Sequence, residues 1–169
     1  MHPSVMQIHP YLLLIELSYY RYNCYLYRIF YYDCPPIEKN VFNPISRKTI
    51  NLGKSNEYKW TTEFFQELKH KRKVALRMGR LSENTLCYNL KYESFKKLLD
   101  GTMQITDLSD SDLKLNIEQK GVDMRIGIDI SSLTYKKQVQ QIILISGDSD
   151  FVPAAKQARR EGIDFILAP

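Results

Sequence analysis

The sequence predicts an α/β fold, because helical and strand-like segments alternate along its C-terminal part. Residues 122–136 and 150–161 place apolar side chains at helical spacing. Residues 141–146 form a short, almost wholly apolar run, and residues 163–167 form a similar one. Such a run is typical of a strand buried on both faces of a sheet. Strands that alternate with helices at this spacing pair in parallel through right-handed crossovers.

The preceding elements are less regular, and we take them in chain order. Residues 26–33 are rich in aromatic and β-branched side chains and predict a strand that ends at Cys34-Pro35-Pro36. Residues 37–56 carry Pro, Asn, Ser and Lys, which predicts a loop or mobile segment. Residues 57–71 predict a helix, and residues 73–81 predict a second strand.

A short helix and a hairpin are expected between these strands and the C-terminal part. Residues 92–99 predict the helix, which Gly101 closes. Residues 103–108 and 113–117 alternate between apolar and polar side chains. The polar segment 109–112 joins them, and this arrangement predicts a β-hairpin.

Composition limits the class of protein. With 169 residues, 44% of them apolar and 25% charged, the chain is expected to form one folded domain. The densest apolar run, residues 11–20, is too short to cross a membrane and contains Glu16. Three cysteines without a CxxC pair predict neither a disulfide framework nor a zinc site, so we expect a reduced, cytoplasmic protein.

Charge is divided unevenly along the chain. Residues 1–100 hold 16 basic and 9 acidic side chains, a balance of +7, whereas residues 101–169 hold 8 and 10, a balance of −2. This division predicts a surface that attracts a polyanion and a pocket that holds a cation.

Two acids follow the most apolar strand. Asp148 and Asp150 come directly after residues 141–146 and open the next helix. Ligands bind beyond the carboxyl ends of parallel strands, which is where these side chains are expected. Helix capping explains one such residue by itself. Two neighbouring carboxylates repel each other, and a bound cation would relieve that repulsion.

Asp123 is the third candidate acid, in the first turn of the helix over 122–136. The helix dipole also favours a negative charge there, so a purely structural role stays open. Three carboxylates without Cys or His predict a Mg²⁺ or Mn²⁺ site, which would promote phosphodiester cleavage. Asp129 lies about 9 Å farther along the same helix. We expect it to be a supporting acid rather than a ligand of the same ion.

A basic segment offers contacts for a nucleic-acid backbone. Residues 69–73 read Lys-His-Lys-Arg-Lys, at the end of a predicted helix. The run is consistent with a solvated helix terminus and also with a track for phosphates. The candidate RNA-binding residues are Lys71, Arg72, Lys73, Arg77 and Arg80.

Four motifs in this order resemble the NYN domain family of PIN-like nucleases. They are YYDCPP (31–36), RMGRL (77–81), QKGVDMRIGID (119–129) and ISGDSDFVP (145–153). The resemblance implies a three-layer α/β/α fold around a central, mainly parallel sheet. It also implies a Mg²⁺- or Mn²⁺-dependent endoribonuclease that acts on RNA, expected to be single-stranded. By motif, Asp123 and Asp148 match the family's metal-binding acids, Asp150 is expected to act with them, and Asp129 matches a recurrent acid.

The family's first strand ends in an Asp-Gly-x-Asn-like motif, and no counterpart is found here. We therefore expect residues 1–24 to be a divergent or truncated segment before an NYN domain at 25–169. Glu16 is the one acid that stands near the position of the missing Asp. Two functions stay open: a metal-dependent endoribonuclease, and a catalytically inactive RNA-binding or regulatory module that lacks the first metal-binding Asp.

Overall fold

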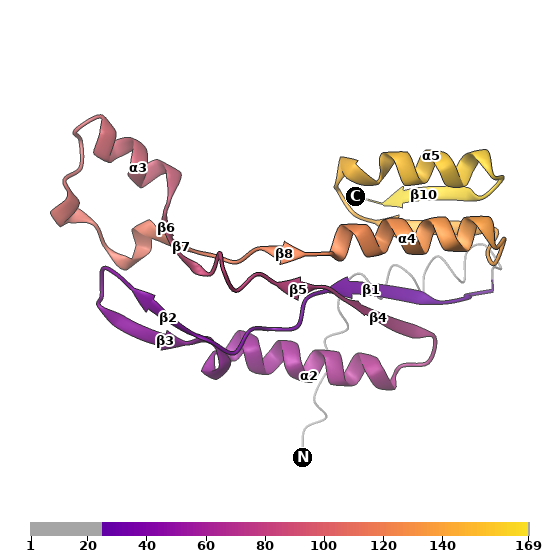
Figure 1. Cartoon of the computed structure of the whole chain (residues 1–169), viewed down its shortest axis with the longest axis horizontal. Helices are drawn as coiled ribbons and strands as arrows, with labels where there is room; N and C mark the ends of the chain where they lie inside the picture. The colour runs from indigo at the N-terminus through magenta and orange to yellow at the C-terminus, as the bar shows by residue number, and fades with distance from the viewer. Residues whose placement is uncertain (1–24, 169) are drawn as a thin grey trace, which may run out of the picture. The chain divides into compact units, whose positions relative to one another are not determined.

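The computed structural model describes residues 25–168 of the chain (Figure 1). Within that range, helices and short strands alternate, which confirms the α/β class. The strands are hydrogen-bonded as pairs, so the single central sheet that we expected stays a prediction. None of the helices in this range has the length and apolarity that crossing a membrane requires. The expectations for residues 1–24, including Glu16, lie outside the described residues.

The described residues divide into two compact units. Unit 1 contains residues 25–30, 72–75 and 126–168, and unit 2 contains residues 31–71 and 76–125. Each unit has its own buried side chains, and we describe each by itself.

The two predicted N-terminal strands pair with each other. They are β1 (Ile29–Asp33) and β4 (Val74–Met78). Ile29 N donates to Lys73 O over 2.8 Å at the start of the pair, and Gly79 N donates to Asp33 O over 2.7 Å at its end. Because the two starts and the two ends meet, the strands run parallel.

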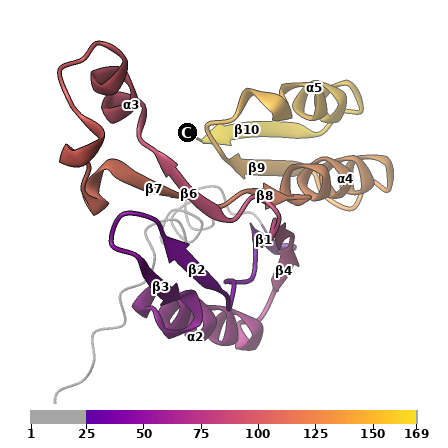
Figure 2. The same cartoon turned by 60° about the vertical axis from the view of Figure 1, so that its left-hand side comes forward.

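Unit 1 is built on a parallel strand pair and two helices. Its strands are β9 (Gln141–Ile145) and β10 (Asp164–Ala168). Between them come the 3-10 turn η4 (Ser149–Phe151) and helix α5 (Val152–Arg160), which lies alongside β10 (Figure 1, Figure 2). This order of strand, helix and strand confirms the expected crossover.

Helix α4 (Val122–Tyr135) confirms the helix expected over 122–136 and buries Ile126 and Ile130 in unit 1. One detail of the expectation for unit 1 is wrong. Ile143, in the middle of β9, is 41% exposed, so the strand is not buried on both faces. An apolar run indicates a strand, but it does not show which faces other elements will cover.

In unit 2, helix α2 (Asn56–His70) confirms the helix expected over 57–71. The Ser55 side chain caps it by accepting from Tyr58 N over 3.0 Å. Phe65 is buried and meets the Tyr31 ring of β1 edge-on, with their centroids 6.3 Å apart. This aromatic contact fastens α2 to the strand pair.

The expectation of a loop over residues 37–56 is wrong. β2 (Asn40–Asn43) and β3 (Lys48–Asn51) form an antiparallel hairpin, which the 3-10 turn η1 (Leu52–Lys54) follows. Asn43 is buried, and its Oδ1 accepts from Ile45 N and Ser46 N over 2.9 and 3.2 Å. These bonds build the hairpin turn without the glycine that usually indicates one.

The hairpin expected over residues 103–117 is also wrong. β7 (Leu113–Asn116) pairs with β6 (Cys87–Leu90), which comes before helix α3 (Tyr92–Leu99). Residues 105–107 and 110–112 instead form the 3-10 turns η2 (Ile105–Asp107) and η3 (Asp110–Asp112). Helix α3 itself has the predicted bounds, and Gly101 follows it with φ 76°.

Candidate active site

In unit 1, the turn after β9 carries Asp148 and Asp150. The Asp148 backbone N–H donates to the Ser146 hydroxyl oxygen over 3.2 Å. Asp148 Oδ1 accepts from Asp150 N over 2.9 Å and so caps η4. Capping is therefore a real role of Asp148. Both carboxylates are exposed, and the cap occupies only one of the two oxygens of Asp148.

In unit 2, Asp123 stands in the first turn of α4 and is exposed. Gly121 precedes it with φ 80°, a conformation that suits glycine. Just before this turn, β8 (Gln119–Lys120) pairs antiparallel with β5 (Arg80–Leu81), and Lys120 stands opposite Arg80. Because Lys120 precedes Asp123 by three residues, this pairing places the segment before Asp123 beside Arg80.

Gly79 permits this arrangement because it lies against three neighbours. A Cβ atom at Gly79 would come within 2.6 Å of Lys120 O, 2.8 Å of Val122 Cγ2 and 3.0 Å of Cys34 Sγ. A side chain does not fit there. Glycine is therefore required for the close approach of the segment before Asp123.

Asp33, the last residue of β1, is not among the candidate site residues named above. Its Oδ1 does accept from Cys34 N, over 2.7 Å, as a turn residue would. The same oxygen lies 3.5 Å from Gln119 Nε2 of β8, so it also joins β1 to the segment before Asp123. Its position at the carboxyl end of a strand was the signal for this second role.

The surroundings of Asp33 affect two neighbouring titratable groups. Burial raises the pKa of the Tyr31 hydroxyl, and the charge of Asp33 and a hydrogen bond to it raise that pKa further. Burial also raises the pKa of the Cys34 thiol, and the Asp33 charge adds to that effect, while the Lys120 amide lowers it. Both groups are therefore protonated at neutral pH.

Asp129 lies in the middle of α4, in unit 1, and is half-buried. Its place on a helix that contributes buried side chains to unit 1 is compatible with the supporting role that we expected. No group of three or more His, Cys, Asp or Glu side chains that could hold a metal ion is found among residues 25–168.

The candidate RNA-binding residues differ in their surroundings. Lys71 and Arg80 in unit 2 and Arg72 in unit 1 are exposed, whereas Arg77 is half-buried on β4. Lys73 is engaged within unit 1: its Nζ donates to Leu26 O over 2.6 Å and lies 3.8 Å from the centre of the Tyr25 ring. That ammonium stabilises the start of β4.

A family model described as the NYN domain matches residues 43–169, three quarters of the chain. The chain belongs to the NYN domain family. Membership places it among the PIN-like proteins and indicates a nuclease-like, RNA-related function. PIN-like nucleases of this kind typically depend on divalent metal ions. No curated protein and no solved structure matches the chain.

The NYN match contains three of the four motifs and all four candidate acids, Asp123, Asp129, Asp148 and Asp150. The YYDCPP motif with Asp33 precedes the matched range. The donors also suit the kind of ion that the family uses. Exposed carboxylate oxygens without Cys or His are hard ligands, which favour Mg²⁺ or Mn²⁺ over zinc.

Proposed function

We propose that this NYN protein is a metal-dependent endoribonuclease that hydrolyses phosphodiester bonds in single-stranded RNA. The observation that carries the proposal is the pair of exposed carboxylates, Asp148 and Asp150, directly after the parallel strand β9. Under this proposal, the strand pairs belong to a three-layer α/β/α arrangement around a mainly parallel sheet, and the protein works in the cytoplasm.

Asp123, Asp148 and Asp150 would hold Mg²⁺ or Mn²⁺, with Asp129 as the supporting acid. When bound, the ion supplies an activated water and stabilises charge on the phosphodiester. The chain's own contribution is to fix the carboxylates. The cap at Asp148 orients its side chain through one oxygen, and the residue itself is exposed. The first turn of α4 favours the negative charge of Asp123.

The basic residues would hold the RNA backbone without reading its sequence. Arg80 is the leading candidate because it is exposed and because its strand partner, Lys120, precedes Asp123 by three residues. Lys71 and Arg72 are exposed cations on the connection between α2 and β4. Arg77 and Lys73 complete the proposed contact set.

The test is cleavage of labelled single-stranded RNA with Mg²⁺ or Mn²⁺, and with EDTA as the metal-free condition. Asp148→Asn is the informative variant, because an amide oxygen still caps η4 while the negative charge is lost. Asp110→Asn is its control: it removes the same charge from the exposed turn η3. We expect EDTA and Asp148→Asn to abolish cleavage and Asp110→Asn to retain it. Cleavage by Asp148→Asn at the wild-type rate would reject the mechanism.

A second candidate function is a catalytically inactive RNA-binding or regulatory module. It is favoured by one observation: the sequence holds no Asp-Gly-x-Asn segment, so the family's first metal-binding Asp has no counterpart in it. RNA binding that weakens with salt, together with intact RNA after incubation with either metal ion, would support this function over the enzyme.

A further inference from the structure

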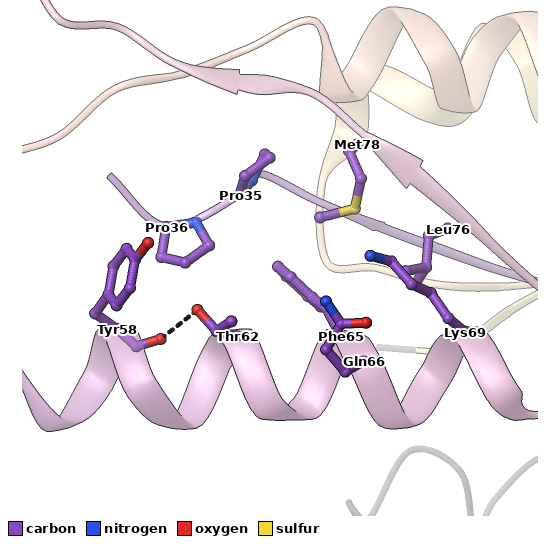
Figure 3. A pocket seen from close by; sticks show the side chains of 9 residues that line it. All are labelled: Pro35, Pro36, Tyr58, Thr62, Phe65, Gln66, Lys69, Leu76 and Met78. Carbon is purple, nitrogen blue, oxygen red and sulfur yellow. Dashed lines mark hydrogen bonds between the residues drawn. The ribbon is translucent and has the colours of Figure 1, made fainter. Parts of the chain in front are cut away.

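A pocket of about 260 Å³ lies within unit 2, between α2, the Pro35-Pro36 segment and β4 (Figure 3). It is separate from the candidate acids, none of which lines it. Typical pockets for drug-sized ligands have volumes of roughly 300–1,000 Å³, so this one has room for a single ring system rather than for a whole ligand of that size. The lining residues are Pro35, Pro36, Tyr58, Thr62, Phe65, Gln66, Lys69, Leu76 and Met78.

The interior of the pocket is apolar and suits a flat ring. Phe65 points into it from α2 and is only 6% exposed, and the Met78 thioether faces it from the strand side (Figure 3). Pro36 forms the opposite wall beside Tyr58 (Figure 3). Aromatic faces and polarizable sulfur both pack well against unsaturated rings.

The rim of the pocket offers a cation and an amide. Lys69 and Gln66 are exposed and make no hydrogen bond or ion pair with other side chains in the part of the chain that the structure describes. Two other polar groups of the lining are already engaged: Tyr58 OH donates to Glu38 Oε2 over 3.4 Å, and Thr62 Oγ1 donates to Tyr58 O over 2.7 Å. The amide and the ammonium are therefore the groups that remain for a ligand.

We propose that this pocket binds one nucleotide residue. The base would lie against Phe65 and Met78, the Gln66 amide would bond to the base edge, and the Lys69 ammonium would contact the phosphate. An apolar slot with one amide and one cation matches the base face, the base edge and the phosphate of a nucleotide, since an amide both donates and accepts. The inferred ligand is a nucleotide within an RNA chain, so the inference rests on the proposed function. A free mononucleotide has the same chemistry.

The experiment measures binding of the full chain to a labelled octanucleotide RNA in EDTA, at several salt concentrations, so that no cleavage occurs. Lys69→Met removes the ammonium from the rim. Lys59→Met is the matched control, because Lys59 is exposed on the same helix but does not line the pocket. Gln66→Leu removes the amide at similar size. Circular dichroism spectra confirm that the three variants fold, and titration with uridine and adenosine 5′-monophosphate tests the free-nucleotide source.

We expect Lys69→Met to weaken RNA binding about tenfold and to reduce the salt slope by about 1. Gln66→Leu is expected to weaken binding by about threefold with the slope unchanged, and Lys59→Met to behave as wild type. If Lys69→Met and Lys59→Met bind RNA equally, the pocket inference is overturned while the proposed function stands. If the wild type binds no RNA in EDTA and also cleaves none with Mg²⁺ or Mn²⁺, the proposed function fails. Mononucleotide binding that Lys69→Met weakens would then support the pocket, and no mononucleotide binding would overturn it.

Discussion

The close approach at Gly79 predicts a large effect from the smallest possible substitution. Gly79→Ala adds one methyl group, and its Cβ would lie 2.6 Å from Lys120 O, 2.8 Å from Val122 Cγ2 and 3.0 Å from Cys34 Sγ. The nearest of these atoms belongs to the backbone and cannot rotate away. The β5 and β8 pair must therefore shift, and forced overpacking of this kind costs about 1–3 kcal/mol.

A glycine in open surroundings supplies the control. Gly127 lies within α4, and a Cβ atom there would meet nothing within 4 Å. Gly127→Ala is therefore expected to stabilise the protein by about 0.5–1 kcal/mol through the better helix propensity of alanine. The two substitutions are chemically identical, so only their surroundings distinguish them.

Thermal and urea unfolding followed by circular dichroism measure both effects. For a chain of this size, 1 kcal/mol corresponds to about 2–4 °C in Tm. Gly79→Ala should lower Tm by about 2–12 °C, and Gly127→Ala should raise it by about 1–4 °C. We also expect Gly79→Ala to reduce RNA cleavage, because the displaced Lys120 segment leads directly to Asp123. A Gly79→Ala protein that unfolds at the wild-type temperature would refute the close packing on which this reasoning rests.

Three further predictions follow from local contacts. Asp148→Ala should cost about 1 kcal/mol in unfolding free energy, whereas Asp148→Asn should cost only a few tenths, because the amide keeps the cap. Bonds from Ser94 and Ser109 lower the pKa of Asp112 to about 2, so its contribution to stability is present above pH 4 and is lost as the pH falls toward 2. NMR titration of Ser94→Ala should show the pKa of Asp112 raised. The exposed Cys87 should react with a thiol reagent before the buried Cys34, whose pKa is raised by burial, and peptide mapping by mass spectrometry would show the reverse order if this packing is wrong.

The regular elements of the chain were predictable because their signals are local. The helices over residues 56–70, 92–99 and 122–135 repeat apolar side chains at helical spacing, and β9 is an apolar run between two helices. Such signals depend on the sequence within a few residues, so they can be recognised without knowledge of tertiary partners.

The two missed regions show where local signals fail. At residues 40–51 the hairpin turn depends on the Asn43 side chain and on the backbone of Arg47, which has φ 55°. The composition of this segment is that of an ordinary loop, so it did not indicate the hairpin. At residues 103–117 a local partner was assumed for β7, but its partner is β6, on the other side of α3. The Ser109-x-x-Asp112 capping box was the overlooked sign of a 3-10 turn.

The positions of the candidate acids depend partly on the local sequence and partly on distant partners. Asp123 and Asp148 are each positioned by neighbours in the sequence: Gly121 and the first turn of α4 for one, Ser146 and the cap of η4 for the other. Their exposure at the start of helical turns was therefore predictable. Whether they hold one ion depends on how residues of unit 1 and unit 2 meet, which no short-range pattern determines. For this reason Asp148→Asn is the more decisive of the two substitutions at that position, since it keeps every local bond and removes only the charge that a shared cation would require.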